Sequence, residues 1–276
     1  MEYNNLILNA LSIYLNEYEC SITPSQIKKV MECGVDELFA YKLLLSNYLA
    51  IENQDIIDMY FDKMVHKLEV KDYIRNPYYE NIPFNNKKID SWQIKKGKYK
   101  PYELFVFDDF KYENDLVIPQ VGYFNEPFYY LAVYDNNRLW MSITPNEINT
   151  MKQPINKAKG NVLTFGLGLG YFAYMCSLKD DVKSVTIVEK DERVIKLFKE
   201  YILPYFVSIE KINIIKEDAY AYLSKMNDDM YDYVFVDIYH DAGDGKEVYL
   251  KMNQYRNRFK KTIFEYWIYN TIKHYI

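Results

Sequence analysis

The spacing of apolar and polar positions changes along the chain, and the clearest pattern lies in its C-terminal part. From Val162 onward, short apolar runs alternate with stretches in which apolar residues recur every three or four positions. The runs predict buried strands and the stretches predict amphipathic helices. We expect strands at 162–165, 184–189, 212–215, 231–238 and 262–267, and helices at 171–178, 191–202, 219–226 and 244–259. This alternation predicts an α/β fold with a doubly wound parallel sheet over residues 158–276. Asp191 and Asp244 are the expected N-caps of two of its helices.

Residues 1–83 have a helical pattern. Thr23 to Gln26 spells a capping box with proline at the first helical position. Another helix is expected at 56–68, where the apolar positions again follow a helical period. Prolines at 77 and 83 mark a break, so we expect a helical N-terminal region that ends at residue 83.

Residues 84–157 are expected to form a small β-rich region. The segment 102–110 is rich in aromatic and apolar residues, as strands are. Segments 128–134 and 139–144 flank a short polar turn, which predicts a hairpin. Thr144 to Glu147 repeats the capping-box pattern and predicts a short helix before the α/β domain.

Four of the nine glycines lie between Gly160 and Gly170, in a chain otherwise poor in glycine. Gly166, Gly168 and Gly170 follow the first expected parallel strand and precede its helix. Glycines at this turn let a ligand approach the backbone, so we predict that all three bind a cofactor. Tight packing of the strand against the helix, without a ligand, is the alternative.

Acidic residues follow the next strands at the same edge of the expected sheet. Glu189 ends the second strand about twenty residues after the glycines, where a carboxylate accepts hydrogen bonds from ribose hydroxyls. Asp218 follows the third strand, and we expect it to bind an adenine amino group, with the Ala219 N–H on the ring. Asp218 could also serve only as a helix cap.

The fourth strand ends at Asp237, and His240 and Asp241 follow it. We predict that these three residues are catalytic and that Asp237 also contacts the cofactor. His240 can accept a proton near neutral pH. Their spacing matches no standard metal motif, so we predict no metal site.

Two cofactors suit such a crevice. Gly168, Gly170 and Ala173 also spell the G-x-G-x-x-A pattern of nicotinamide dinucleotide sites. Acids after both the third and the fourth strands favour S-adenosylmethionine instead.

The stretch from Val162 to His240 resembles the class I S-adenosylmethionine-dependent methyltransferases, which have a Rossmann-like domain. Within it, VTIVEKDERVIKLF, EDAYAYL and YDYVFVDI resemble the spermidine synthase (aminopropyltransferase) branch, which also places a β-rich domain first. LWMSITPNEINTM, GLGLGYFAYM and FVDIYHD are similar to a group of bacterial methyltransferase-like proteins. The resemblance implies cofactor binding by the residues already named: Gly166, Gly168, Gly170, Glu189, Asp218 and Ala219.

Three positions depart from these families. Methyltransferases often have an acid where this chain has Thr164. Spermidine synthases have an aspartate at the position of Leu169, and a second acid at the position of His240. A diamine needs carboxylates at both ends, so putrescine is not the expected acceptor. The sheet is also expected to be shortened at its C-terminal end, with five parallel strands and no antiparallel pair after them.

Composition limits the partners. The formal net charge is −5, which gives no argument for nucleic-acid or membrane binding. Three widely spaced cysteines and no signal-like start favour a cytoplasmic protein. A homodimer is left open, and the small-molecule acceptor is not identified.

The expected function is therefore that of a transferase, an S-adenosylmethionine-dependent methyltransferase. Aminopropyl transfer from decarboxylated S-adenosylmethionine to an amine other than putrescine is the first alternative. A non-catalytic cofactor-binding or scaffold protein is the second, and a nicotinamide oxidoreductase is the third.

Overall fold

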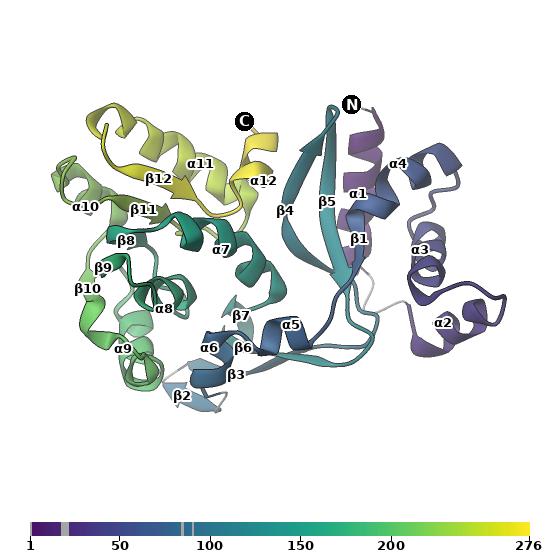
Figure 1. Ribbon diagram of the computed structural model, residues 1–276, viewed down its shortest axis with the longest axis horizontal. Coiled ribbons are helices and arrows are strands. Elements are labelled where there is room, and N and C mark those ends of the chain that lie inside the picture. Colours follow the sequence, from purple (N-terminus) through teal and green to yellow (C-terminus); the bar gives the residue numbers. More distant parts are fainter. Residues whose placement is uncertain (1, 18–21, 84–85, 90) are drawn as a thin grey trace. The chain divides into compact units, whose positions relative to one another are not determined.

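The computed structural model describes residues 2–17, 22–83, 86–89 and 91–276 (Figure 1). Residues 84–85, where the expected β-rich region begins, lie outside this set. The chain forms two compact units, and each is built from separate segments. The first unit comprises 1–74, 97–130 and 144–146, and the second comprises 75–96, 131–143 and 147–276. The two compact units interleave along the chain. They do not test the division into three consecutive domains expected from the sequence, which stays a prediction.

The first unit contains helices packed on a small sheet. Its helices are α1 (Glu2–Glu17), α2 (Pro24–Met31), α3 (Glu37–Tyr48), α4 (Gln54–Met64) and α5 (Lys71–Ile74). Its strands β1 (Val65–Lys67), β5 (Leu116–Tyr123) and β4 (Phe105–Glu113) form a sheet in the order β1-β5-β4. The capping box at Thr23 is present as predicted, with the Thr23 and Gln26 side chains each bonding to the other's backbone N–H.

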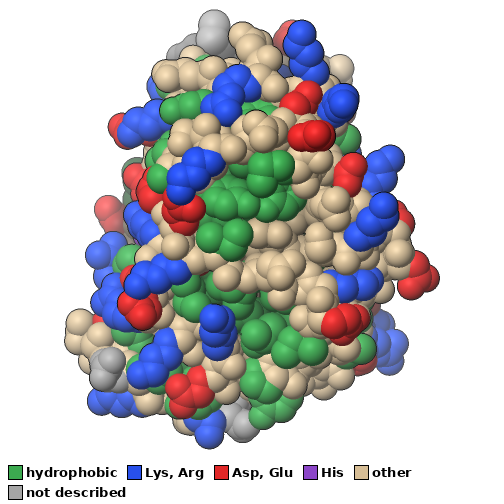
Figure 2. Space-filling model, turned by 90° about the vertical axis from the view of Figure 1, so that its left-hand side faces the viewer, with side chains coloured by type: hydrophobic (Ala, Val, Ile, Leu, Met, Phe, Trp, Pro, Cys, Tyr) green, Lys and Arg blue, Asp and Glu red, His purple; other side chains and the backbone are tan. Residues whose placement is uncertain are grey.

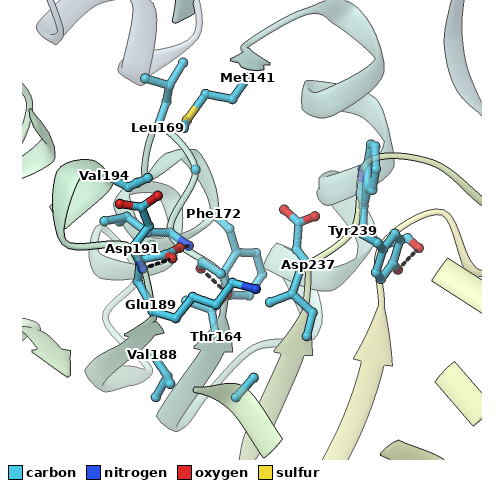
Figure 3. Close-up of a pocket in the computed structure, with 18 of the residues that line it drawn as sticks. Met141, Thr164, Leu169, Phe172, Val188, Glu189, Asp191, Val194, Asp237 and Tyr239 are labelled. Carbon is cyan, nitrogen blue, oxygen red and sulfur yellow. Dashed lines mark hydrogen bonds between the residues drawn. The ribbon is translucent and has the colours of Figure 1, made fainter. Parts of the chain in front are cut away.

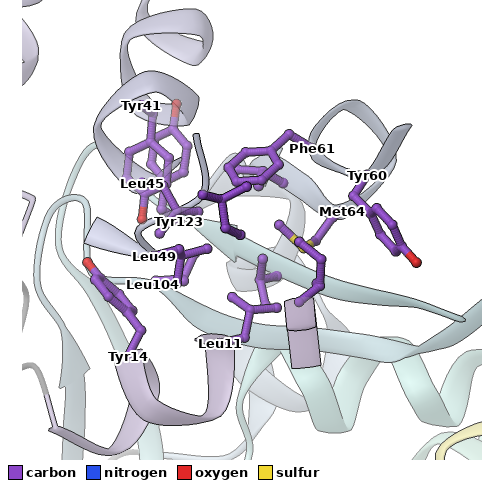
Figure 4. Close-up of a cluster of buried hydrophobic side chains, with 14 of the residues drawn as sticks. Leu11, Tyr14, Tyr41, Leu45, Leu49, Tyr60, Phe61, Met64, Leu104 and Tyr123 are labelled. Carbon is purple, nitrogen blue, oxygen red and sulfur yellow. The ribbon is translucent and has the colours of Figure 1, made fainter. Parts of the chain in front are cut away.

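Apolar and tyrosine side chains from α1, α3, α4 and β5 fill the core of this unit (Figure 4). The rings of Tyr41 and Tyr123 stack with their centroids 3.7 Å apart. The Tyr41 hydroxyl donates a hydrogen bond to the carbonyl of Tyr102 at 3.1 Å. Tyr41 therefore serves here as apolar packing with a hydrogen-bonded tip.

One predicted helix ends early. The segment expected to be helical over 56–68 leaves the helix at Met64, and Val65 starts strand β1. This strand pairs in parallel with β5, with Val65 opposite Val121. The partner strand lies more than fifty residues away in sequence, so the local pattern could not show the change.

A four-stranded sheet has the order β2-β3-β6-β7. Its strands are β2 (Lys87–Ile89), β3 (Trp92–Tyr99), β6 (Phe128–Asp135) and β7 (Arg138–Ser142). The antiparallel pair β6 and β7 confirms the predicted hairpin. Helices α6 (Pro77–Asn81) and α7 (Pro145–Lys157) precede and follow this part of the chain.

The second unit is organised around five parallel strands in the order β10-β9-β8-β11-β12. The strands are β8 (Gly160–Phe165), β9 (Val182–Glu189), β10 (Ile212–Lys216), β11 (Tyr233–Val236) and β12 (Ile263–Tyr266). Helices α8 (Tyr171–Ser177) and α9 (Glu192–Tyr201) lie on one face, and α10 (Ala219–Lys225) and α11 (Ala242–Asn253) on the other (Figure 1). Short 3₁₀ turns (Leu203–Tyr205, Ile209–Lys211, Arg256–Arg258) and α12 (Tyr269–His274) complete it. The doubly wound α/β fold predicted from sequence is confirmed.

The bounds that local sequence signals predicted for these elements are close to the observed bounds, with one exception at α11. Asp191 caps α9 as predicted, because its carboxylate accepts the Arg193 N–H. The predicted cap of α11 was Asp244, but the cap is Asp241, which accepts the Asp244 N–H at 3.0 Å. Ala242 and Gly243 form the first turn, so the helix begins earlier than its apolar pattern suggested.

Figure 2 shows the side of the molecule on which β10 and α9 lie. Apolar side chains gather near the middle of this face, and Lys, Arg, Asp and Glu side chains are interspersed around them. Among the helices of the described residues, none combines the length and apolar character that a membrane crossing requires.

Candidate functional site

A cavity of about 550 Å³ lies at the carboxyl ends of the five parallel strands (Figure 3). Its floor is made by residues that follow β8, β9, β10, β11 and β12. Strand β7 and helix α7 form another wall, to which they contribute Trp140 and Glu147. Ligands of open α/β sheets bind in this crevice, so the cavity is the candidate site.

The three clustered glycines all have positive φ angles, but they have different neighbours. A Cβ on Gly166 would lie 1.9 Å from the carbonyl oxygen of Asp237, and one on Gly170 would lie 2.3 Å from the Phe198 ring. At Gly168 nothing lies within 4 Å of such an atom. Only Gly168 therefore leaves open space for a ligand, whereas Gly166 and Gly170 permit close packing of the protein itself. Gly170 does not line the cavity.

Glu189 lines the cavity at the end of β9 and is fixed by backbone donors. Its Oε2 accepts the Leu167 N–H at 3.2 Å, and its Oε1 accepts the Asp191 N–H at 2.8 Å. The carboxylate thus connects the second strand to the glycine loop. Figure 3 shows Glu189 and Asp237 on opposite sides of the cavity.

Asp218 and Ala219 also line the cavity, at the start of α10. Oδ1 of Asp218 accepts the N–H groups of Tyr220 at 2.9 Å and Ala221 at 3.0 Å. Asp218 is therefore a helix cap, as the sequence allowed. Both bonds use Oδ1, and the first N–H of a helix has no intrahelical acceptor, so Asp218 and Ala219 can still present polar atoms to a ligand.

Asp237 lines the cavity, and the structure brings Glu147 of α7 into the same space. Burial raises the pKa of Asp237, and the nearby Glu189 carboxylate raises it further. Burial also raises the pKa of Glu147 well above its ordinary value, with a further contribution from Asp237. The two carboxyls therefore hold a proton that exposed carboxyls would release.

Sequence reasoning missed Glu147 as a site residue. It treated this residue only as the partner in a local capping box, and nothing in the local pattern points toward Asp237, ninety residues later. The one available signal was an acid at the start of the helix that leads directly into β8.

The two remaining predicted catalytic residues are neighbours in the chain, but only one of them lines the cavity. His240 lines the cavity, and its ring packs edge-on against Trp140 at a centroid distance of 5.0 Å. Asp241 caps α11 and does not line the cavity. The structure therefore brings Asp237 and His240 to the site, but not Asp241. In the part of the chain that is described, no three His, Cys, Asp or Glu side chains are grouped to hold a metal ion.

A buried tyrosine holds the glycine loop from outside the cavity. Tyr78 of α6 is fully buried, and its hydroxyl donates to the carbonyl of Leu169 at 2.6 Å. Asn76 beside it donates to the Tyr171 hydroxyl at 2.7 Å. A segment ninety residues upstream thereby fixes the conformation of the loop.

Replacing Glu147 by glutamine should change how stability depends on pH. Carboxyls with a raised folded pKa bind more protons in the folded state. The free energy of unfolding therefore falls as the pH rises from about 4, the ordinary carboxyl pKa, through the raised pKa values of Asp237 and Glu147. The Glu147→Gln variant removes one of the two interacting charges. We expect it to be more stable than the parent above this range and equally stable at acid pH.

Urea denaturation at a series of pH values measures this difference. Glu210→Gln, at an exposed position, is the matched control and should follow the parent curve. If the free energy of unfolding of Glu147→Gln depended on pH as that of the parent does, Glu147 and Asp237 would not be a buried pair of carboxyls that repel each other.

Residues 150–265 match the family model for the "Spermine/spermidine synthase domain". Together with the sheet topology, this match supports an α/β fold of the class I methyltransferase type. Within that class, the domain has a spermidine synthase-like fold, as the sequence resemblance predicted. The match supports a transferase of the methyltransferase-like or aminopropyltransferase kind.

Solved structures are similar only at a distance. The spermidine synthase from Thermotoga maritima has 14% identity and a TM-score of 0.39, and the match covers 69% of this chain and 62% of that one. A spermidine synthase in complex with the transition-state analogue AdoDATO has 14% identity, a TM-score of 0.38 and the same coverage. A provisionally assigned O-methyltransferase from Klebsiella pneumoniae has 17% identity and a TM-score of 0.30, covering 39% of this chain and 46% of that one. The chain thus spans less than two thirds of the length of either spermidine synthase. No curated protein matches it significantly.

Proposed function

We propose that the chain is a transferase that binds S-adenosylmethionine and methylates an amine. The observation that carries this proposal is the open backbone at Gly168, placed on the cavity floor between the strand ends that bear Glu189 and Asp237. A side chain at Gly168 would fill the space in which a ligand would contact the loop. Glu189 and Asp218 follow the next two strands of the sheet.

The residues on the floor fit the parts of such a cofactor. Glu189 would accept hydrogen bonds from the ribose hydroxyls, and its fixed orientation suits that role. Asp218 would accept from the adenine amino group, with the Ala219 N–H directed to the ring. When bound, the cofactor supplies a carbon activated by its positively charged sulfur.

Asp237 and Glu147 would act on the acceptor. An amine is protonated in water and must lose a proton before its nitrogen can attack carbon. The carboxylate pair can bind the ammonium form and take that proton. Alignment of the amine within the cavity then supplies most of the remaining acceleration.

Leu169 favours methyl transfer. It lines the cavity at the loop position where the resemblance places an aspartate in spermidine synthases, and it is only 2% exposed. An apolar side chain there offers no partner to the amino group of an aminopropyl donor. The second candidate is aminopropyl transfer from decarboxylated S-adenosylmethionine, which the family match favours.

Calorimetric titration with S-adenosylmethionine, its decarboxylated form and NADH tests the proposal. We expect S-adenosylmethionine to bind, and Glu189→Gln to weaken binding by about tenfold or more. The control is Glu192→Gln, at the exposed first position of α9, where Glu192 forms a surface ion pair with Lys216. Tighter binding of the decarboxylated form would favour aminopropyl transfer, and binding of NADH alone would contradict both candidates. Binding without turnover of any amine would indicate a cofactor-binding scaffold.

A further inference from the structure

The order of the strands divides the cavity into two ends. Residues after β10 and β9 lie on one side of the glycine loop, and residues after β11 and β12 lie on the other. Asp218 and Glu189 belong to the first end, where the proposed function puts the cofactor. Asp237 and Trp267 belong to the second end, which is left for the acceptor.

Helix α7 closes this second end. The indole N–H of Trp267 donates to the Thr150 hydroxyl at 2.9 Å and so ties α7 to the strand end of β12. Glu147 and Met151 of the same helix line the cavity. Trp140 contacts His240, which follows β11, and therefore lies at this end as well.

In the described part of the chain, six acidic side chains line the cavity: Glu147, Glu189, Asp191, Glu217, Asp218 and Asp237. Four of them already bond to the protein. Glu189 and Asp218 accept backbone N–H groups, Asp191 pairs with Arg193 at 2.6 Å, and Glu217 pairs with Lys225. Among the described residues, the carboxyl groups of Glu147 and Asp237 form no hydrogen bond or ion pair with another side chain or backbone group. Both belong to the acceptor end.

Apolar and aromatic side chains form much of the acceptor end, where His240 also lies. Its walls include Trp140, Ile143, Met151 and Trp267. Ile143 and Met151 are buried, and Trp267 is 8% exposed. The one lysine or arginine that lines the cavity within the described chain is Lys190, directly after β9 at the other end.

We infer that the acceptor is a monoamine attached to an aromatic or bulky apolar group. This inference rests on the proposed function. One pair of uncommitted carboxylates at a single place matches one ammonium group, and the surrounding indole and thioether groups match an apolar body. A linear diamine would leave its second charge against these apolar walls, without a carboxylate.

The transfer balances with these groups. The ammonium of the acceptor gives one proton to the Glu147–Asp237 pair, and the freed lone pair forms the new nitrogen–carbon bond. The carbon–sulfur bond breaks, and its electron pair stays on sulfur as a neutral thioether. The product nitrogen keeps the positive charge, and the proton on the pair passes to solvent.

The test is a panel of probes with the full-length chain: phenethylamine, n-butylamine, putrescine and phenethyl alcohol. We expect kcat/KM for phenethylamine to exceed that for putrescine by about tenfold or more, and no turnover of the alcohol. Trp140→Ala should lower kcat/KM for phenethylamine by about tenfold and affect n-butylamine less. Leu139→Ala, at the neighbouring position of β7 with 47% exposure, is the control and should match the parent.

Several outcomes would overturn the inference: putrescine as the better substrate, equal use of the alcohol, or an unchanged preference in Trp140→Ala. Calorimetric binding of the same probes separates this inference from the proposed function. Selective, Trp140-dependent binding of phenethylamine by a chain that binds no sulfonium cofactor would refute the proposed function and retain the amine site. Binding of the cofactor without selective binding of phenethylamine would refute the inferred amine site and retain the proposed cofactor binding.

Discussion

Replacing Asp237 by asparagine should lower the transfer rate by about a hundredfold or more, because an amide cannot take the proton of the acceptor amine. The substitution keeps the shape of the side chain, so the affinity for the cofactor should change little. Single-turnover rates at saturating cofactor and amine measure the effect. The rate of the parent should rise with pH as the Glu147–Asp237 pair loses its proton, and this dependence should weaken in the variant.

The control for this substitution is Asp229→Asn, at an exposed loop position outside the cavity. It changes the net charge equally and should leave the rate unchanged. Equal rates for the parent and Asp237→Asn would show that the proton leaves by another route and would remove Asp237 from the mechanism.

Gly168→Ala should abolish measurable cofactor binding or weaken it by about tenfold or more. The residue has a φ of +52°, and its Cβ would project into open space at the cavity floor. Any side chain at such a φ also carries a strain of roughly 1–2 kcal/mol. Calorimetric titration gives the affinity, and thermal unfolding gives the strain.

Gly34 is a matched control for Gly168. It has a φ of +87° and likewise nothing within 4 Å of an added Cβ, but it lies at the end of α2 in the other unit. Gly34→Ala should therefore lose comparable stability and keep full cofactor affinity. A similar loss of affinity in both variants would mean that Gly168 acts through stability and not through contact with the cofactor.

Sequence patterns predicted the five parallel strands because each strand is a short, largely apolar run that lies next to a helix in the chain. The same local signals failed at Val65, where pairing with β5 converts the end of an expected helix into a strand. They also placed the cap of α11 at Asp244 instead of Asp241, because the apolar period does not mark the first turn.

The candidate site was predictable in part. Gly168, Glu189, Asp218, Ala219 and Asp237 follow strands of one sheet, and topology alone brings strand ends together. Trp140 and Glu147 could not be found in this way, because they precede the first parallel strand. Their place at the cavity depends on how β7 and α7 pack over the sheet, which no local spacing encodes.

The two ends of the cavity have different origins along the chain. The cofactor end is formed by residues after Gly160, whereas the acceptor end also needs the hairpin and helix that come before it. Recombination between related genes at the start of the parallel sheet would exchange all residues of the cofactor end together. It would leave β7 and α7, which line the acceptor end, unchanged. In this architecture, the choice of acceptor can thus diverge over evolution while the means of binding the donor is inherited intact.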